Sequence, residues 1–241
     1  MKVYVVGTSC SWFKRNDTSF IIDDNIIFDM PSGSYKDIIK TTDQNKIEAV
    51  IISHFHSDHF ADLAYLVKFC MSYAEGRKEK LRVYGPKGIL KKLIERNTAY
   101  ELNEDERSEE EIQKAVTFIE IEDGMTFKEG KYNVSVYKME HGKPETLGFT
   151  FKEDNGKTIG FSADTCYCEN LEKIVSSSNY AFVEMTLLHQ SKSHLSSNEF
   201  VALSKKYEKT KMFPVHTTDV AQKFAEENGL NFLHDGEILN F

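Results

Sequence analysis

A chain of 241 residues with 40% hydrophobic and 28% charged residues has the composition of a globular protein, and we expect a single domain over residues 1–241. The net charge of −8 argues against an extended nucleic acid as partner, because phosphate binding depends on Lys and Arg. The sequence has no apolar run of about 18 residues, no signal-peptide pattern and no cysteine framework, so we expect a cytoplasmic protein that does not enter a membrane.

The first half of the chain mixes predicted strands with short helices. Short β-branched runs predict strands at 3–6, 19–22, 26–28, 47–52 and 81–84. Helical spacing predicts helices at 34–40, 60–69 and 86–97. Ser34 is the predicted N-cap of the first helix, because Asp37 follows it three residues later as in a capping box.

Two charged stretches follow one another in the middle of the chain. The segment Arg77–Arg96 is basic, and Glu101–Glu111 is acidic. We expect the two to neutralise each other on a solvated helical hairpin, and a phosphate-steering patch is the alternative. The polar stretch 100–114 is also a candidate lid, so the sequence leaves open whether these segments form a lid or an interface.

Strands dominate the next part, and the tail alternates helix with strand. A meander is predicted from strands at 116–121, 125–128, 132–139, 146–151 and 157–162. The tail adds helices at 168–176, 196–208 and 219–227, and strands at 180–184, 212–215 and 237–241. This order predicts an α+β protein with two packed sheets and helices on their outer faces.

A motif rich in histidine follows the strand at 47–52. It places His54, His56, Asp58 and His59 within six residues. Imidazole and carboxylate groups are ligands for zinc and related divalent ions. His54 and His56 can reach one ion while Asp58 and His59 turn toward a second. The alternative is a surface loop with no function. Three of the eight histidines of the chain occur in this short segment directly after a predicted strand, which argues against that alternative.

Three further candidate ligands each follow a predicted strand. His141 comes after the strand at 132–139, Asp164 after the strand at 157–162, and His216 after the strand at 212–215. One His after a strand is more often structural, but strand ends that share an edge can bring such residues together. With the motif, these residues complete a site for two ions.

The ligand series His54, His56, Asp58, His59, His141, Asp164 and His216 resembles that of the metallo-β-lactamase superfamily. The resemblance implies a four-layer αββα sandwich with a dinuclear site. It implies that His54, His56 and His141 bind the first ion. It implies that Asp58, His59 and His216 bind the second, that Asp164 bridges the two, and that Asp58 also counts among the catalytic residues.

Within that superfamily the chain is most similar to ribonuclease Z and related phosphodiesterases. The similarity lies in the early Gly7-Thr8-Ser9 turn, the late Ser193-His194-Leu195-Ser196 stretch and Glu184 before it. It implies that His194 protonates the leaving alkoxide and that Glu184 orients His194. Only 22 residues separate His141 from Asp164, so the long tRNA-gripping insertion of ribonuclease Z is absent.

The sequence therefore predicts a hydrolase that cleaves a small phosphodiester or nucleotide through a metal-bound hydroxide. Two zinc ions are favoured because the ligands are rich in nitrogen, and Mn²⁺ or Fe²⁺ could occupy the same site. The alternatives are a carboxyl-type hydrolase acting on a lactone, thioester or lactam, a tRNA 3′-end endonuclease, and a metal-dependent binding protein without turnover. A homodimer is compatible with the sequence.

Overall fold

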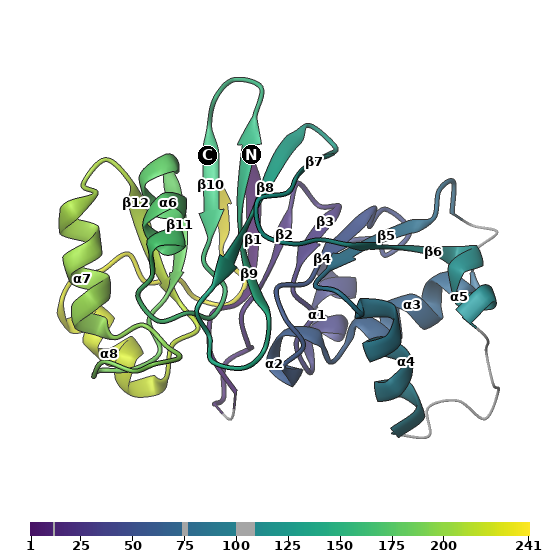
Figure 1. Ribbon diagram of the computed structural model, residues 1–241, viewed down its shortest axis with the longest axis horizontal. Helices are drawn as coiled ribbons and strands as arrows, with labels where there is room; N and C mark the ends of the chain where they lie inside the picture. Colours follow the sequence, from purple (N-terminus) through teal and green to yellow (C-terminus); the bar gives the residue numbers. More distant parts are fainter. Residues whose placement is uncertain (12, 74–76, 100–108) are drawn as a thin grey trace. The chain divides into compact units, whose positions relative to one another are not determined.

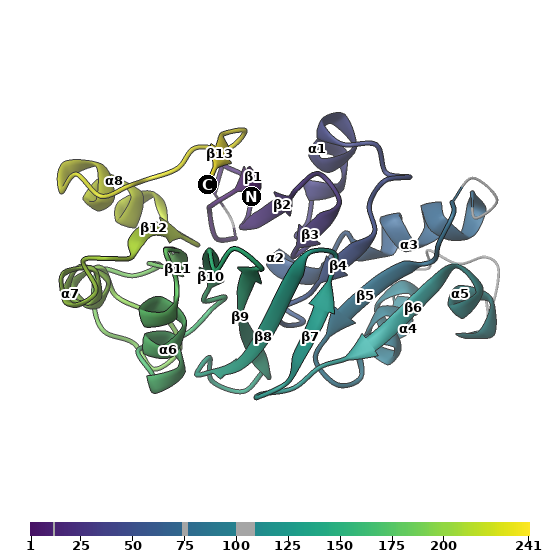
Figure 2. The same ribbon diagram turned by 90° about the horizontal axis from the view of Figure 1, so that it is seen from above.

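The computed structural model describes residues 1–11, 13–73, 77–99 and 109–241, and the chain divides into two compact units. Unit 1 comprises Met1–Val6, Ser19–Ile121 and Gly236–Phe241. Unit 2 comprises Gly7–Thr18 and Glu122–Asp235. Each unit contains one β-sheet with its own helices (Figures 1 and 2). The single domain predicted for the whole chain stays a prediction.

Unit 1 contains a seven-stranded sheet in the order β13-β1-β2-β3-β4-β5-β6. Its strands are β1 (Lys2–Gly7), β2 (Ser19–Ile22), β3 (Ile26–Phe28), β4 (Ala49–Ile51), β5 (Leu81–Gly85), β6 (Val116–Glu120) and β13 (Ile238–Asn240). Strands β3 to β6 pair in parallel, whereas β2 with β3 and β1 with β13 pair antiparallel. The carboxyl ends of β3 to β6 therefore share one edge of the sheet.

In the described part of unit 1, five helices bury apolar side chains in the same core as the sheet. They are α1 (Ser34–Thr41), α2 (Ser57–Phe60), α3 (Leu63–Ser72), α4 (Ile89–Ala99) and α5 (Glu109–Ala115). Val50 on β4, Leu66 on α3 and Leu93 on α4 belong to one buried cluster. Burial of this apolar surface holds the parallel strands and helices together. Among the described helices, none combines the length and apolar character needed to cross a bilayer.

Unit 2 contains a six-stranded sheet in the order β12-β11-β10-β9-β8-β7. Its elements are β7 (Thr126–Glu129), β8 (Tyr132–Met139), β9 (Thr146–Glu153), β10 (Thr158–Phe161), α6 (Glu169–Ser177), β11 (Tyr180–Glu184), α7 (Ser197–Lys206), β12 (Lys211–Val215) and α8 (Asp219–Glu227). Strands β7 to β10 are antiparallel, and β10 to β12 are parallel. Helix α6 packs on this sheet at Gly148 and Gly160, where an added Cβ would lie within 2.7 Å of Ile174.

Two sequence predictions about the elements are wrong. Ser34 does not cap α1: it is the first helical residue, and its hydroxyl donates instead to the Pro31 carbonyl over 2.7 Å. Gly33 is the N-cap, and Oδ2 of Asp62 accepts the Tyr35 N–H over 3.0 Å. The predicted meander is also interrupted, because β6 pairs in parallel with β5 in the sheet of unit 1 while β7 begins the sheet of unit 2.

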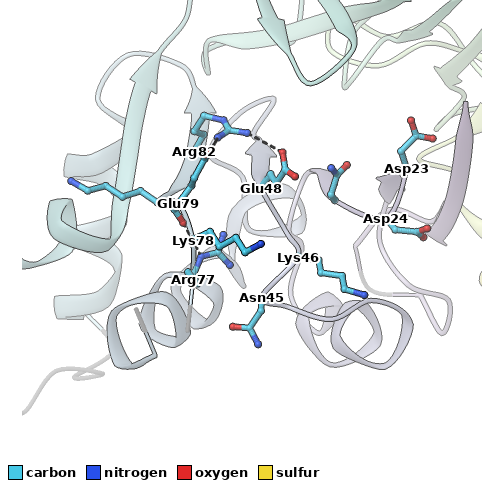
Figure 3. A pocket seen from close by; sticks show the side chains of 11 residues that line it. Asp23, Asp24, Asn45, Lys46, Glu48, Arg77, Lys78, Glu79 and Arg82 are labelled. Atoms are coloured by element: carbon cyan, nitrogen blue, oxygen red, sulfur yellow. Dashed lines mark hydrogen bonds and ion pairs between the residues drawn. The ribbon is translucent and has the colours of Figure 1, made fainter. Parts of the chain in front are cut away.

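The basic segment Arg77–Arg96 contributes to an open pocket at the edge where β3, β4 and β5 begin (Figure 3). Two of its arginines, Arg77 and Arg82, are engaged locally. Arg77 donates to the carbonyls of Gln44 and Ile47, and Arg82 pairs with Glu48 and Glu79. The expected partner run, Glu101–Glu111, lies largely outside the described residues, as does most of the candidate lid at 100–114.

Candidate metal centre

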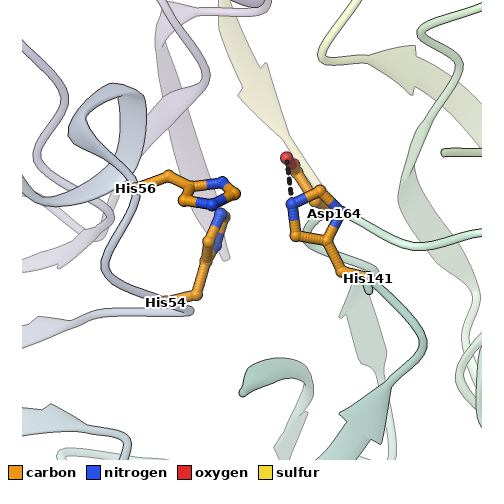
Figure 4. A group of neighbouring side chains, drawn as sticks. All are labelled: His54, His56, His141 and Asp164. Carbon is orange, nitrogen blue, oxygen red and sulfur yellow. Dashed lines mark ion pairs between the residues drawn. The ribbon is translucent and has the colours of Figure 1, made fainter. Parts of the chain in front are cut away.

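The histidine motif of unit 1 begins directly after β4 and continues into α2. His54 and His59 are buried, whereas His56 is exposed at the N-cap of α2. The ring centroid of His54 lies 4.7 Å from that of His56 and 4.2 Å from that of His59 (His54 and His56 are drawn in Figure 4). Asp58 Oδ2 lies 3.9 Å from Nε2 of His59. The structure thus brings together the four residues that the sequence proposed as ligands in this motif.

A buried carboxylate at the end of β3 orients two of these imidazoles. Oδ1 of Asp29 accepts the Ser53 N–H over 2.7 Å, and Oδ2 lies 2.7 Å from Ser53 Oγ and 2.8 Å from Nδ1 of His59. Ser53 Oγ in turn lies 3.0 Å from Nδ1 of His54. With Nδ1 of both imidazoles engaged in this way, each can offer Nε2 to an ion, because a hydrogen bond at one ring nitrogen sets which nitrogen can bind metal.

Burial raises the pKa of Asp29, while its hydrogen bonds with His59 and Ser53 act in the opposite direction. Asp29 also has a positive φ of 56°. No sequence pattern predicts a functional role for Asp29. The sequence feature that could have identified Asp29 is its position directly after β3, a fully buried strand. β3 pairs with β4, the strand that precedes the histidine motif.

The second cluster lies in unit 2, where three strands end. His141 follows β8, Asp164 follows β10 and His216 follows β12. Oδ2 of Asp164 lies 3.6 Å from Nε2 of His141, the pair marked in Figure 4, and 3.4 Å from Nε2 of His216. Nδ1 of His141 donates to the Ser193 carbonyl over 2.7 Å, so Nε2 is the nitrogen that could bind an ion. One carboxylate oxygen therefore lies between two imidazole nitrogens.

Glu184, at the end of β11, is fully buried and orients His194. Each of its carboxylate oxygens lies 3.1 Å from Nδ1 of His194. Glu184 lies close enough to His141, Asp164 and His194 to share a cation with them. Its oxygens, however, also accept hydrogen bonds from the Thr165 N–H, the Leu195 N–H and the Thr186 hydroxyl. A carboxylate engaged by four groups is an orienting group rather than a ligand.

Residues of unit 2 support an unusual backbone conformation at His216, whose φ is 52°. Its N–H donates to Thr18 Oγ1 over 3.0 Å, and the next N–H, of Thr217, donates to the Thr8 carbonyl over 3.0 Å. The Arg15 guanidinium donates to the hydroxyls of Thr8 and Thr217 over 2.9 and 2.8 Å. Burial lowers the pKa of Arg15. These bonds stabilise a conformation that non-glycine residues rarely adopt. No sequence pattern predicts this role for Arg15.

The nine predicted site residues fall into two sets. Unit 1 holds His54, His56, Asp58 and His59, and unit 2 holds His141, Asp164, Glu184, His194 and His216. Within unit 2 the His194 ring centroid lies 4.8 Å from that of His141 and 5.6 Å from that of His216. Imidazole nitrogens beside carboxylate oxygens match the donor set of zinc and similar ions, so the residues in both sets fit divalent metal.

Comparison with known proteins identifies relatives for most of the chain. The family model described as beta-lactamase superfamily domain matches residues 33–217. A ribonuclease Z from Methanosarcina mazei is 29% identical over 166 residues, which cover 64% of this chain and 49% of that protein. The chain spans about half or less of the length of the curated relatives that it matches first.

Two solved structures resemble nearly the whole chain. The metallo-beta-lactamase fold protein YhfI from Bacillus subtilis has a TM-score of 0.77 at 17% identity, and the match covers 99% of this chain and 98% of that one. A diphosphatase from the PhnP family also has a TM-score of 0.77, at 14% identity, covering 100% of this chain and 97% of that one. These likenesses confirm the predicted α+β class and metallo-β-lactamase fold.

Proposed function

The chain belongs to the beta-lactamase superfamily, a family of metal-dependent hydrolases, and from this premise we propose that it is a dinuclear phosphodiesterase acting on small phosphodiesters or nucleotides. The observation that carries the proposal is the Glu184–His194 pair. It provides an oriented imidazole beside two of the proposed metal ligands, His141 and His216. Release of an alkoxide from phosphorus requires such a proton donor, whereas a carboxyl-type hydrolase depends above all on an oxyanion site for its tetrahedral intermediate.

We assign the metal ligands in the order that the family resemblance gives. By that resemblance His54, His56 and His141 would hold one ion, Asp58, His59 and His216 would hold the second, and Asp164 would serve both. The position of Asp164 Oδ2 between the Nε2 atoms of His141 and His216 supports the bridging role. Zinc suits this nitrogen-rich set best. Bound divalent ions would supply a nucleophile by lowering the pKa of water, and would neutralise charge on the phosphoryl oxygens.

His194 provides the proton for the leaving group. Because Glu184 engages Nδ1, proton transfer takes place at Nε2. The imidazole is partly exposed, with 23% of its side-chain surface accessible, while Glu184 is fully buried. Solvent can therefore restore the proton at His194 after each turnover, and the buried carboxylate keeps the ring in one orientation.

The names of the relatives and the spacing within unit 2 support a phosphorus–oxygen bond as the target. Ribonuclease Z and the PhnP-family diphosphatase both carry names of enzymes that act on such bonds. Between His141 and Asp164 the chain forms only β9, β10 and their turns. This short connection favours a small phosphodiester over a structured tRNA.

The decisive experiment measures hydrolysis of bis-p-nitrophenyl phosphate and of a lactone by zinc-loaded and chelator-treated protein. We expect zinc-dependent hydrolysis of the phosphodiester, with a slower rate in His194→Ala. His189→Ala is the matched control, since His189 is an exposed histidine outside both clusters. Turnover of the lactone alone, unaffected by His194→Ala, would establish a carboxyl-type hydrolase. Zinc and ligand binding without turnover of either compound would establish a binding protein.

A further inference from the structure

The Thr186 hydroxyl lies between an orienting carboxylate and a proposed metal ligand. Thr186 follows β11 and is buried, with 6% of its surface exposed. Its Oγ1 lies 2.7 Å from Oε2 of Glu184, 2.9 Å from Nδ1 of His216 and 2.8 Å from the His216 carbonyl oxygen. A single hydroxyl therefore connects Glu184, which orients His194, with His216.

The hydroxyl has one proton, and this fixes the direction of the bonds. A carboxylate is a stronger acceptor than a neutral carbonyl or imidazole, so Thr186 donates to Glu184. Nδ1 of His216 then carries a proton and donates to Thr186 Oγ1. In this tautomer Nε2 of His216, 3.4 Å from Asp164 Oδ2, holds the lone pair that a metal ion requires. The reverse direction would place the proton on Nε2 and prevent ligation.

Unit 1 contains the same arrangement of groups. Asp29 binds His59 directly and reaches His54 through the Ser53 hydroxyl. In unit 2, Glu184 binds His194 directly and reaches His216 through the Thr186 hydroxyl. In both units one buried carboxylate orients two imidazole rings. It bonds the first ring directly and reaches the second through a hydroxyl group.

We propose that Thr186 is a positioning residue that sets the tautomer and orientation of His216, so that Glu184 controls both the proton donor and a metal ligand. The proposal deepens the function proposed above and rests on it for the role of His216. It assigns to Thr186 an effect on metal affinity that its packing alone would not give. The hydroxyl, rather than the methyl group, carries the effect.

Three variants test this role. Thr186→Val keeps the shape of the side chain and removes the hydroxyl, and Thr186→Ser keeps the hydroxyl and removes the methyl group. Thr210→Val is the matched control. Thr210 is another buried threonine of unit 2, and its hydroxyl donates to the Val175 and Ser178 carbonyls over 2.9 and 2.8 Å, outside the metal cluster. Thermal unfolding of each metal-free variant reports the loss of stability separately.

Zinc affinity is measured by competition with a chromophoric chelator. The rate of hydrolysis is measured with bis-p-nitrophenyl phosphate as substrate. We expect Thr186→Val to weaken the binding of one zinc ion by about 10–100-fold, as loss of a hydrogen-bond partner of a metal-binding imidazole does. Thr186→Ser should restore most of that affinity. Thr210→Val should bind zinc as the wild type does, even if it unfolds at a lower temperature.

Wild-type zinc affinity in Thr186→Val, or no rescue by Thr186→Ser, would overturn the role of Thr186 while leaving the proposed function standing. An equal loss of affinity in Thr210→Val would reduce the effect to general destabilisation and overturn the role as well. Wild-type protein that binds two zinc ions but cleaves no phosphodiester would overturn the proposed function alone, because the affinities still test Thr186. Wild-type protein that binds no zinc would overturn both.

Discussion

Nδ1 of His59 donates a hydrogen bond of 2.8 Å to Oδ2 of Asp29, a residue thirty positions earlier in the chain. The bond joins the end of β3 to the helix that begins inside the histidine motif. It orients a proposed metal ligand through residues that belong to unit 1 alone. Binding an ion then requires little further ordering of this imidazole, which is the energetic advantage of a preorganised ligand.

The first prediction concerns this carboxylate. Asp29→Asn replaces one acceptor oxygen by an NH₂ donor, so either the Ser53 N–H or the pair of Ser53 Oγ and His59 Nδ1 loses its acceptor. We expect zinc affinity to fall by about 10–100-fold. Asp24→Asn is the control, because Asp24 pairs with Lys2 on the surface of the same unit. Competition titration should show wild-type affinity in the control, and an unchanged affinity in Asp29→Asn would contradict the orienting role.

The second prediction separates proton donation by His194 from a structural role. Loss of a general acid slows the release of a poor leaving group far more than that of a good one. In His194→Ala we expect kcat for a dinucleoside monophosphate, whose leaving group is an alkoxide, to fall by about 10²–10⁴-fold. The fall for bis-p-nitrophenyl phosphate should be clearly smaller. Equal losses on both substrates would argue that His194 acts by holding its neighbours in place.

The third prediction is a pH dependence of stability at Asp62. Burial raises the pKa of Asp62, although its carboxylate accepts the Tyr35 N–H at the start of α1. The folded protein therefore holds this proton more tightly than the unfolded chain. Its contribution to stability is greatest at low pH and is lost as the pH rises through the folded-state pKa.

Asp62→Asn removes this titration and keeps an oxygen that can accept the Tyr35 N–H. The free energy of unfolding of the wild type minus that of the variant should decrease as the pH is raised from about 4 to about 7. Urea unfolding at a series of pH values measures this difference. A difference that is constant or increases with pH would show that the folded-state pKa is not raised.

The fourth prediction tests the contact between α6 and the sheet of unit 2. A Cβ on Gly160 would lie 2.6 Å from both Ile174 Cγ2 and Ser178 Oγ. Gly160→Ala should therefore lower the free energy of unfolding by about 1–3 kcal/mol, the usual effect of overpacking a core. Thr126→Ala, at an exposed position of β7, is the control for placing alanine in the same sheet. The free energy of unfolding of both variants is measured with a denaturant. An equal decrease in the two variants would contradict a close contact at Gly160.

Sequence patterns predicted most elements well because their signals are local. Tyr132–Met139, Tyr180–Glu184 and Asp219–Glu227 form the predicted elements with the predicted bounds. Strand pairing is not a local property. The residues at 116–120 predict a strand, but their composition does not tell whether this strand pairs with the one before it or the one after it. Its parallel pairing with β5 depends on the crossover through α4 and α5.

Residue type and position were enough to identify the candidate ligands. Histidine and aspartate directly after buried strands are unusual enough to identify His54, His141, Asp164 and His216 as candidates from residue type and position alone. The groups that orient these candidates became visible only in the folded chain. Asp29, Thr186 and Arg15 are of common types, and each acts through a hydrogen bond to a residue distant in sequence, as Arg15 does with Thr217 at a separation of 202 residues. Such bonds form only where folding brings strand ends together, so no local pattern can encode them.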